Sequence, residues 1–241
     1  MSDQLSTNQR GGYRFLPAIA PYSSGVVALP GFEIVHVTLQ RPLPWKDGMT
    51  AARAHVEASG GTQHNLCAFE LRCPAPFTLQ GFVDFNREYR ALLKDWDMMV
   101  DGINPVARTN VAPVVSPPAE SVVHAFFWTR PSVLHRPTFV VVGGGELPDG
   151  ELAERRIVRA GETSASAMLE KADCVVGLMN GRLTGLEATD ELITAIDVYT
   201  AHPLHELLNR ILIPQIPAAA RVGVQWHYTR PPIVDIEFEM D

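Results

Sequence analysis

The chain repeats one order of predicted elements, and this repetition restricts its fold more than any other feature. In each half, a strand and a helix are followed by a second strand, a second helix and two final strands. The final strands begin near an arginine in both halves. Arg108 is followed by a valine three positions later and a proline ten positions later, and so is Arg221. Such self-similarity indicates a duplicated unit of about 110 residues.

The individual elements follow from apolar periodicity and from turn residues. In the first half, we predict a hairpin from segments 19–29 and 32–39, a helix at 49–61, a strand at 66–73, a helix at 82–96, and strands at 108–115 and 121–129. In the second half, we predict a strand at 139–148, a helix at 162–179, a strand at 191–200, a helix at 203–213, and strands at 219–229 and 233–240.

The predicted fold class is α+β, in two consecutive units. We place a flexible N-terminus at residues 1–12, the first unit at 13–132 and the second unit at 133–241. A single α+β domain is the alternative, because 241 residues also fit within one large domain.

The composition argues against several classes of partner. The 46% of hydrophobic and 20% of charged residues are ordinary for a globular protein. The net charge is −7 and the 20 Lys and Arg residues are scattered, whereas nucleic-acid binding depends on clustered basic residues. The chain shows no apolar run long enough for a membrane span and no secretion signal at its N-terminus. We therefore expect a cytoplasmic protein. Cys67, Cys73 and Cys174 include no CxxC pair and are expected to be free thiols.

Short segments in both halves resemble the motifs of one protein family. The segments are 20–26 (APYSSGV), 84–89 (DFNREY), 105–111 (PVARTNV), 144–148 (GGELP), 220–224 (ARVGV) and 234–239 (VDIEFE). In this order they resemble the RidA family, also called the YjgF or L-PSP family, from residue 13 to residue 241. The resemblance implies two RidA-like (chorismate-mutase-like) units, each a mixed β-sheet packed on two helices. It also implies a homo-oligomer, for which we favour a trimer with ligand sites between subunits.

Neither half carries the complete set of these motifs. In the first half, residues 40–42 (QRP) occupy the place of the family's Ser-Gly turn. His124 stands where the second half has Glu237, sixteen residues after the arginine in each case. The second half lacks the opening tyrosine motif and the NxxY asparagine. These departures favour one composite site, or one working site beside a decayed one.

The resemblance implies an enamine or imine deaminase that needs no metal and no cofactor. Its small-molecule substrate would carry a carboxylate, which a guanidinium binds by a planar two-point contact. We expect Arg221 to bind this carboxylate and Glu237 to position or activate the attacking water. Arg108 would serve a second pocket with Asn86, where His124 replaces the acid and could act as a base.

The remaining candidates line or close the predicted pocket. Backbone groups of Gly144 and Gly145 would form its wall, and Tyr22 would close it from another unit. Each candidate also has a structural explanation. Both arginines could form surface ion pairs, Tyr22 could be a packed aromatic, Asn86 could bond to a loop, and His124 could be a core histidine.

Three further patterns carry less weight. Alternation along 233–240 places Glu237, Glu239 and Asp241 on one face of a strand, and we interpret Glu239 and Asp241 as solvated. The glycines at 143–145 lack the residues that complete a phosphate-binding loop. His202 and His205 have no evident third zinc ligand.

Two other functions remain open beside the deaminase. One is a non-catalytic small-molecule-binding or regulatory protein, which the incomplete motifs in the first half favour. The other is a ribonuclease, an activity sometimes attributed to the family, against which the acidic charge argues.

Overall fold

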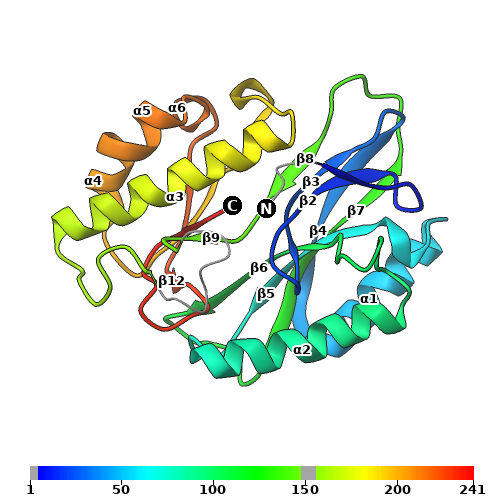
Figure 1. The fold of residues 1–241 in the computed structure, drawn as a ribbon, viewed down its shortest axis with the longest axis horizontal. Helices are drawn as coiled ribbons and strands as arrows, with labels where there is room; N and C mark the ends of the chain where they lie inside the picture. Colours follow the sequence, from blue (N-terminus) through cyan, green and yellow to red (C-terminus); the bar gives the residue numbers. More distant parts are fainter. Residues whose placement is uncertain (1–4, 148–155) are drawn as a thin grey trace.

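The computed structural model describes residues 5–147 and 156–241, which form two β-sheets with helices on both (Figure 1). The first part of the chain contains β1 (Ser6–Asn8), β2 (Tyr13–Pro17), β3 (Ser23–Ala28), β4 (Phe32–Pro44), α1 (Trp45–Ala58), β5 (Leu66–Arg72), α2 (Leu79–Asp95), β6 (Ala107–Pro113) and β7 (Val122–Pro131). The second part contains β8 (Phe139–Val141), β9 (Gly144–Gly145), α3 (Ala165–Gly185), β10 (Asp197–Tyr199), α4 (His205–Leu207), a π-helical turn (Leu208–Leu212), α5 (Ile213–Gln215), α6 (Ala218–Val222), β11 (Gln225–His227), β12 (Thr229–Arg230) and β13 (Glu239–Met240). Short 3-10 turns precede β5 and β10, at Gln63–Asn65 and Asp190–Leu192.

The larger sheet is built from both parts of the chain. Its strands run in the order β1-β2-β3-β6-β5-β7-β4, with β8 beside β3 and β12 beside β6. The pairs β5–β6 and β3–β6 are parallel, and the other neighbours are antiparallel.

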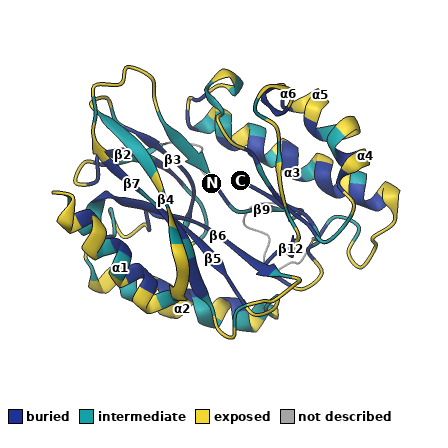
Figure 2. Ribbon diagram, turned by 180° about the vertical axis from the view of Figure 1, so that it is seen from behind, coloured by how far each residue is buried: buried dark blue, intermediate teal, exposed yellow. Residues whose placement is uncertain are grey.

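Helices α1 and α2 cover one face of this sheet, with their buried residues turned toward it (Figure 2). The Thr78 hydroxyl caps α2 by accepting the backbone N–H of Gly81 at 3.1 Å. The buried residues of α2 lie on one helical face, and Tyr89 and Leu93 pack with α1, β5 and β7 in an apolar core. The sequence prediction of an amphipathic helix here is confirmed.

The smaller sheet has the order β11-β10-β13-β9 and belongs entirely to the second part. Helix α3 and the short helices α4–α6 pack together beside it (Figure 1). Their shared core includes Val175 and Met179 of α3, Val198 of β10 and Phe238 just before β13. This second core is separate from the core under α1 and α2.

The predicted fold class of two consecutive RidA-like (chorismate-mutase-like) units is wrong. Each of two such units would contain its own complete sheet. Here β8 and β12, which belong to the second part of the chain, pair with strands of the first part and extend its sheet. The second part keeps a sheet of only very short strands. Strands β3 and β6 thus form part of their backbone hydrogen bonds with strands of the second part of the chain.

The individual elements of the first half are mostly confirmed, but the predicted hairpin of 19–29 and 32–39 is wrong. The turn forms, since Gly31 has a φ of 86° and the Phe32 N–H donates to the Leu29 carbonyl at 3.0 Å. The chain then crosses to the far edge of the sheet. Among the described strands, β3 pairs with β2, β6 and β8, while β4 pairs with β7.

The second half departs further from the sequence prediction. The segment predicted as a strand at 219–229 begins as helix α6, which contains Arg221, and only then forms β11 and β12. The strand predicted at 233–240 is regular only at its end, as β13. Part of the strand predicted at 139–148 lies outside the described residues, as do residues 1–4 of the predicted N-terminus.

None of the helices in the described part of the chain has the length and apolarity that crossing a bilayer requires. The domain boundary at 132/133 and the trimeric assembly remain predictions.

Candidate active site

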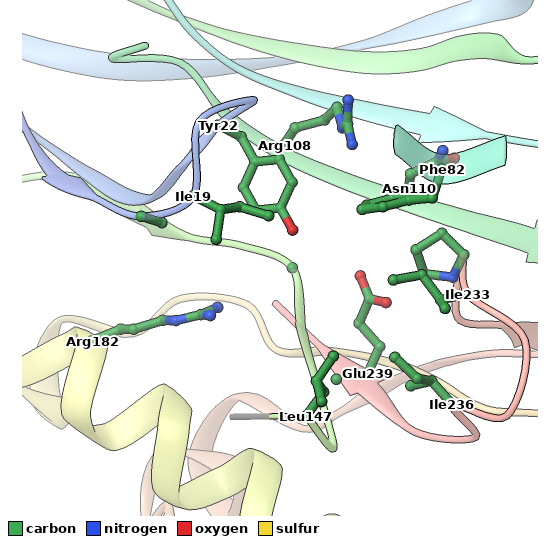
Figure 3. Close-up of a pocket in the computed structure, with 14 residues that line it drawn as sticks. Ile19, Tyr22, Phe82, Arg108, Asn110, Leu147, Arg182, Ile233, Ile236 and Glu239 are labelled. Carbon is green, nitrogen blue, oxygen red and sulfur yellow. The ribbon is translucent and has the colours of Figure 1, made fainter. Parts of the chain in front are cut away.

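A cavity of about 70 Å³ lies where the two parts of the chain meet (Figure 3). The first part supplies residues before β3, on α2 and on β6, and the second part supplies the Gly143–Leu147 segment, α3 and the last strand. The lining residues are Ala18, Ile19, Tyr22, Phe82, Arg108, Asn110, Gly143, Gly145, Leu147, Arg182, Pro232, Ile233, Ile236 and Glu239.

Arg108 projects from β6 into an aromatic cage beside this cavity. Its residue is only 2% exposed, and its guanidinium carbon lies 4.6 Å from the ring centre of Tyr89 and 5.1 Å from that of Tyr22. Phe82 and Phe85 complete the cage at 5.8 Å and 5.4 Å. Cation–π attraction to several rings favours a cation here. Burial nevertheless lowers the pKa of Arg108 from its ordinary value.

In the described part of the chain, the hydrogen bonds of Arg108 leave two of its donor nitrogens unused. Its Nη2 donates to Oδ1 of Asn86 at 2.6 Å. Within the described residues, no partner reaches its Nε or Nη1, and the same holds for both side-chain polar atoms of Asn110. A buried cation with unused donors is costly unless an anion approaches it. The arrangement therefore suits a carboxylate ligand.

Glu239 brings a carboxyl group into the same space. It lies in β13 and is 4% exposed. Burial, followed by the charge of Asp241, raises the pKa of Glu239 well above its ordinary value, although the charges of Arg182 and Arg108 act in the opposite direction. The environment thus favours the protonated carboxyl, which can donate a proton to a ligand.

Arg182 approaches the cavity from α3. It is a buried side chain whose Nη1 donates to the Val142 carbonyl at 2.8 Å. In Figure 3 its guanidinium, the Tyr22 hydroxyl and the Glu239 carboxyl point toward one space, with Arg108 and Asn110 across from Glu239. The cavity therefore combines two guanidinium groups, one buried carboxyl and one amide.

Glycine is required at 143, where the chain passes Arg108. Gly143 has a φ of 62°, and a Cβ atom there would lie 2.8 Å from the Arg108 carbonyl oxygen. The close passage brings the second part of the chain against β6 and so closes the cavity.

Several residues predicted from the sequence lie together at this cavity. Tyr22, Arg108 and Gly145 line it, and Asn86 holds Arg108. Gly144 pairs with Met240 in the β9–β13 ladder next to the lining. The cavity lies between the two parts of the chain, and the composite site, like its alternative of one working and one decayed site, stays a prediction.

Three other predicted residues lie elsewhere. Arg221 is exposed on α6 and donates to the carbonyls of Asp190, Glu191 and Ile193. Glu237 is half-buried and lies 2.9 Å from Nε2 of His202. His124 lies in β7, where burial and then Arg72 lower its pKa. Roles for these three in the chemistry remain predictions.

Sequence reasoning missed Glu239, Arg182 and Asn110. The interpretation of Glu239 and Asp241 as a solvated face is wrong, because Glu239 is 4% exposed, and the half-buried Asp241 accepts hydrogen bonds from the Thr109 hydroxyl and the Gly143 backbone N–H. Arg182 lay beyond the predicted end of its helix. Asn110 could have been found, since alternation places it on the same face as Arg108.

A second, larger cavity has a volume of about 490 Å³. Its carboxyl groups Glu70 and Asp241 have more ion-pair and hydrogen-bond partners than Arg108 in the smaller cavity. Glu70 pairs with His36 at 3.1 Å and with Arg72 at 3.2 Å. Asp241 accepts from Thr109 and from the backbone of Gly143. The smaller cavity, with its unused donors, is therefore the candidate active site.

Metal and thiol chemistry have little support in the described residues. Within 5–147 and 156–241, no three His, Cys, Asp or Glu side chains converge as a metal site requires. Cys67 and Cys73 are free and buried, and burial raises the pKa of Cys73 to about 12. Neither thiol is poised to act as a nucleophile.

Comparison with known proteins gives one family and one clear relative. A model of the family described as 2-aminomuconate deaminase CnbZ matches residues 5–241. A 2-amino-5-chloromuconate deaminase from Comamonas testosteroni is 40% identical over 236 residues, covering 96% of this chain and 92% of that protein.

The solved structures that match are more distant. A chorismatase has a TM-score of 0.45 and 13% identity, over 98% of this chain and 88% of that one. A cyanuric acid hydrolase has a TM-score of 0.38 and 14% identity, over 86% and 51%. Both scores are too low to define the fold. The family match is decisive: the predicted RidA membership is wrong, and the chain belongs to the 2-aminomuconate deaminase CnbZ family.

Proposed function

We propose that this protein hydrolyses 2-aminomuconates, which are flat, conjugated dicarboxylates, to the corresponding 2-oxo acids and ammonia. The observation that carries the proposal is the buried carboxyl of Glu239, whose pKa burial raises, in one cavity with two buried guanidinium groups, Arg108 and Arg182. Two cations suit a ligand with two carboxylates. The named activity of the 40%-identical relative, on a 2-amino-5-chloromuconate, agrees with this chemistry.

The substrate is an enamine, and its hydrolysis requires an acid. Glu239 donates its proton to a carbon of the diene, while the nitrogen lone pair shifts to make the C2=N iminium. Water then adds to C2 and returns a proton to the ionised Glu239. The resulting carbinolamine passes its hydroxyl proton to nitrogen and expels ammonia, which leaves the C2 carbonyl. One water is consumed and one ammonia is released, and Glu239 ends protonated.

Each lining group has a part in this scheme. Arg108 binds one carboxylate through its unused donors, and the aromatic cage holds the guanidinium in place. Arg182 faces the second carboxylate. Asn110, with no partner in the described residues, is available to bind the amino group or the attacking water.

The test is an assay of purified protein with 2-aminomuconate, following ammonia release and the loss of diene absorbance. We expect turnover by the wild type and a fall in kcat of about 10²- to 10⁴-fold in Glu239→Gln, which cannot donate the proton. Glu237→Gln tests the carboxylate predicted from the sequence alone. Stabilisation by 2-aminomuconate without any ammonia release would show a binding protein and overturn the proposal.

A further inference from the structure

A second pair of charged side chains lies behind the wall of the candidate active site. Lys171 on α3 and Glu146, which follows β9, have side chains with no solvent exposure, and Nζ lies 3.0 Å from Oε1. Lys171 also donates to the Val158 carbonyl at 2.9 Å. The pair lines neither of the two cavities, so it belongs to the frame around the site.

Glu146 holds the strand that carries Glu239. Its Oε1 accepts the backbone N–H of Glu237 at 2.6 Å, and its Oε2 accepts that of Phe238 at 3.0 Å. The preceding residue, Gly145, pairs with Glu239 in the β9–β13 ladder. Residues 145 and 146 therefore fix three consecutive positions of the last strand, ending at Glu239.

Helix α3 anchors this arrangement at two points. Lys171 and Arg182 are three turns apart and lie on one face of the helix. Lys171 holds Glu146, and Arg182 donates to the carbonyl of Val142. The wall segment between Val142 and Glu146 is thus bound to α3 at both ends. Helix α3 therefore holds both Arg182 and, through Glu146, the strand that carries Glu239.

We propose that Glu146, held by Lys171, is a positioning residue that sets the place of the Glu239 carboxyl relative to the two arginines. A buried ion pair adds little net stability over an apolar pair of similar size. A carboxylate, however, can accept two successive backbone N–H groups, which an apolar side chain cannot do. The inference rests on the proposed role of Glu239 as the acid.

The charge of Glu146 also acts on Glu239 directly. Burial, Asp241 and Glu146 raise the pKa of Glu239, and Arg182 and Arg108 lower it. Removal of the Glu146 charge should therefore lower the pKa of Glu239. Since the acid must be protonated to act, the loss of activity at high pH should begin at a lower pH.

The experiment compares Glu146→Gln with a buried ion pair elsewhere. Glutamine keeps the size of the side chain but can accept only one of the two backbone N–H groups. The double variant Glu146→Gln/Lys171→Met removes both charges and avoids an unpaired lysine. Glu70→Gln, which breaks the buried pair with Arg72 in the larger sheet, is the matched control. For each protein, kcat, KM and the pH profile with 2-aminomuconate are measured together with Tm.

We expect both Glu146 variants to lose about ten- to hundredfold in kcat with little change in KM, and to shift the alkaline limb to lower pH. Glu70→Gln should lower Tm without either effect. Wild-type kcat and pH profile in the Glu146 variants, with Glu239→Gln inactive, would refute the positioning role and leave the proposed function standing. Full activity in Glu239→Gln would instead refute the role of Glu239 as the acid, and with it this inference, while absence of ammonia release in the wild type would overturn the proposed function. Loss of folding in both Glu146 variants, while Glu70→Gln folds, would reduce the pair to a structural role and equally refute the inference.

Discussion

The substitution Arg108→Lys tests the carboxylate contact at the candidate active site. The guanidinium gives one hydrogen bond to Asn86 at 2.6 Å, and its Nε and Nη1 have no partner in the described residues. A lysine presents a single ammonium group in place of the planar guanidinium, so it loses the two-point contact with a carboxylate. One lost hydrogen bond to a charged group is worth about 1.5–3 kcal/mol. Affinity for the ligand should therefore fall about 10- to 150-fold.

The assay uses cis,cis-muconate, which has both carboxylates but no amine and so binds without reacting. Calorimetry gives Kd for wild type, Arg108→Lys and Arg221→Lys, and Tm shows that each protein is folded. The comparison also decides between Arg108 in the smaller cavity and Arg221, which lies on α6 and lines the larger cavity. A change in Kd of less than about twofold for Arg108→Lys would refute the carboxylate role. A large change in Kd for Arg221→Lys would place the carboxylate contact at Arg221 instead.

Three further substitutions or probes test other parts of the structure. Burial raises the pKa of Glu239, so there is a pH range in which this carboxyl is ionised in the unfolded chain and protonated in the folded protein. In that range, folding takes up a proton. Stability should then fall as pH rises from about 4.3, by at most about 1.4 kcal/mol per pH unit, and Glu239→Gln should flatten this dependence in thermal melts. Gly145→Ala places a Cβ 2.9 Å from Cγ2 of Ile236 and should lower the free energy of unfolding by about 1–3 kcal/mol in urea denaturation. Gly177→Ala on α3 places a Cβ where no described atom outside the helix and the chain neighbours lies within 4 Å, and should raise it by about 0.5–1 kcal/mol. Cys67 is fully buried with a raised pKa, so its alkylation by iodoacetamide should follow global unfolding and not precede it.

The first half of the fold was predictable because its elements are long and carry local patterns. Helix α2 has its buried residues at helical spacing, and β5 and β7 contain the apolar runs LCAF and AFFW. The pairing of these strands was less predictable. A turn at Gly31 suggests a hairpin, but β4 pairs with a strand that is distant in the sequence. Local patterns do not contain that information.

The fold of the second half was harder to predict from the sequence for a related reason. Its strands have two or three residues, so they are stabilised by partners and not by their own sequence. Arg221 therefore fell in a helix, although the motif around it resembles that around Arg108.

The candidate site was predictable where it rests on the first half. Arg108, Asn86 and Tyr22 come from motifs whose order and chemistry could be recognised, even though the family assigned to them was wrong. Glu239 was missed because alternation separates two faces of a strand but does not reveal whether both are covered. Here β13 lies between β10 and β9 in the smaller sheet, and its acidic residue Glu239 is as buried as its apolar residue Met240.

The pairing of β12 with β6 and of β8 with β3 has a kinetic consequence. Contacts between segments far apart in a chain form slowly, because the chain loses loop-closure entropy before these contacts stabilise it. Glu239 and Arg108 lie on segments that these strand pairs bring together, so we expect catalytic competence to appear in the last phase of refolding, after the helical signal has recovered.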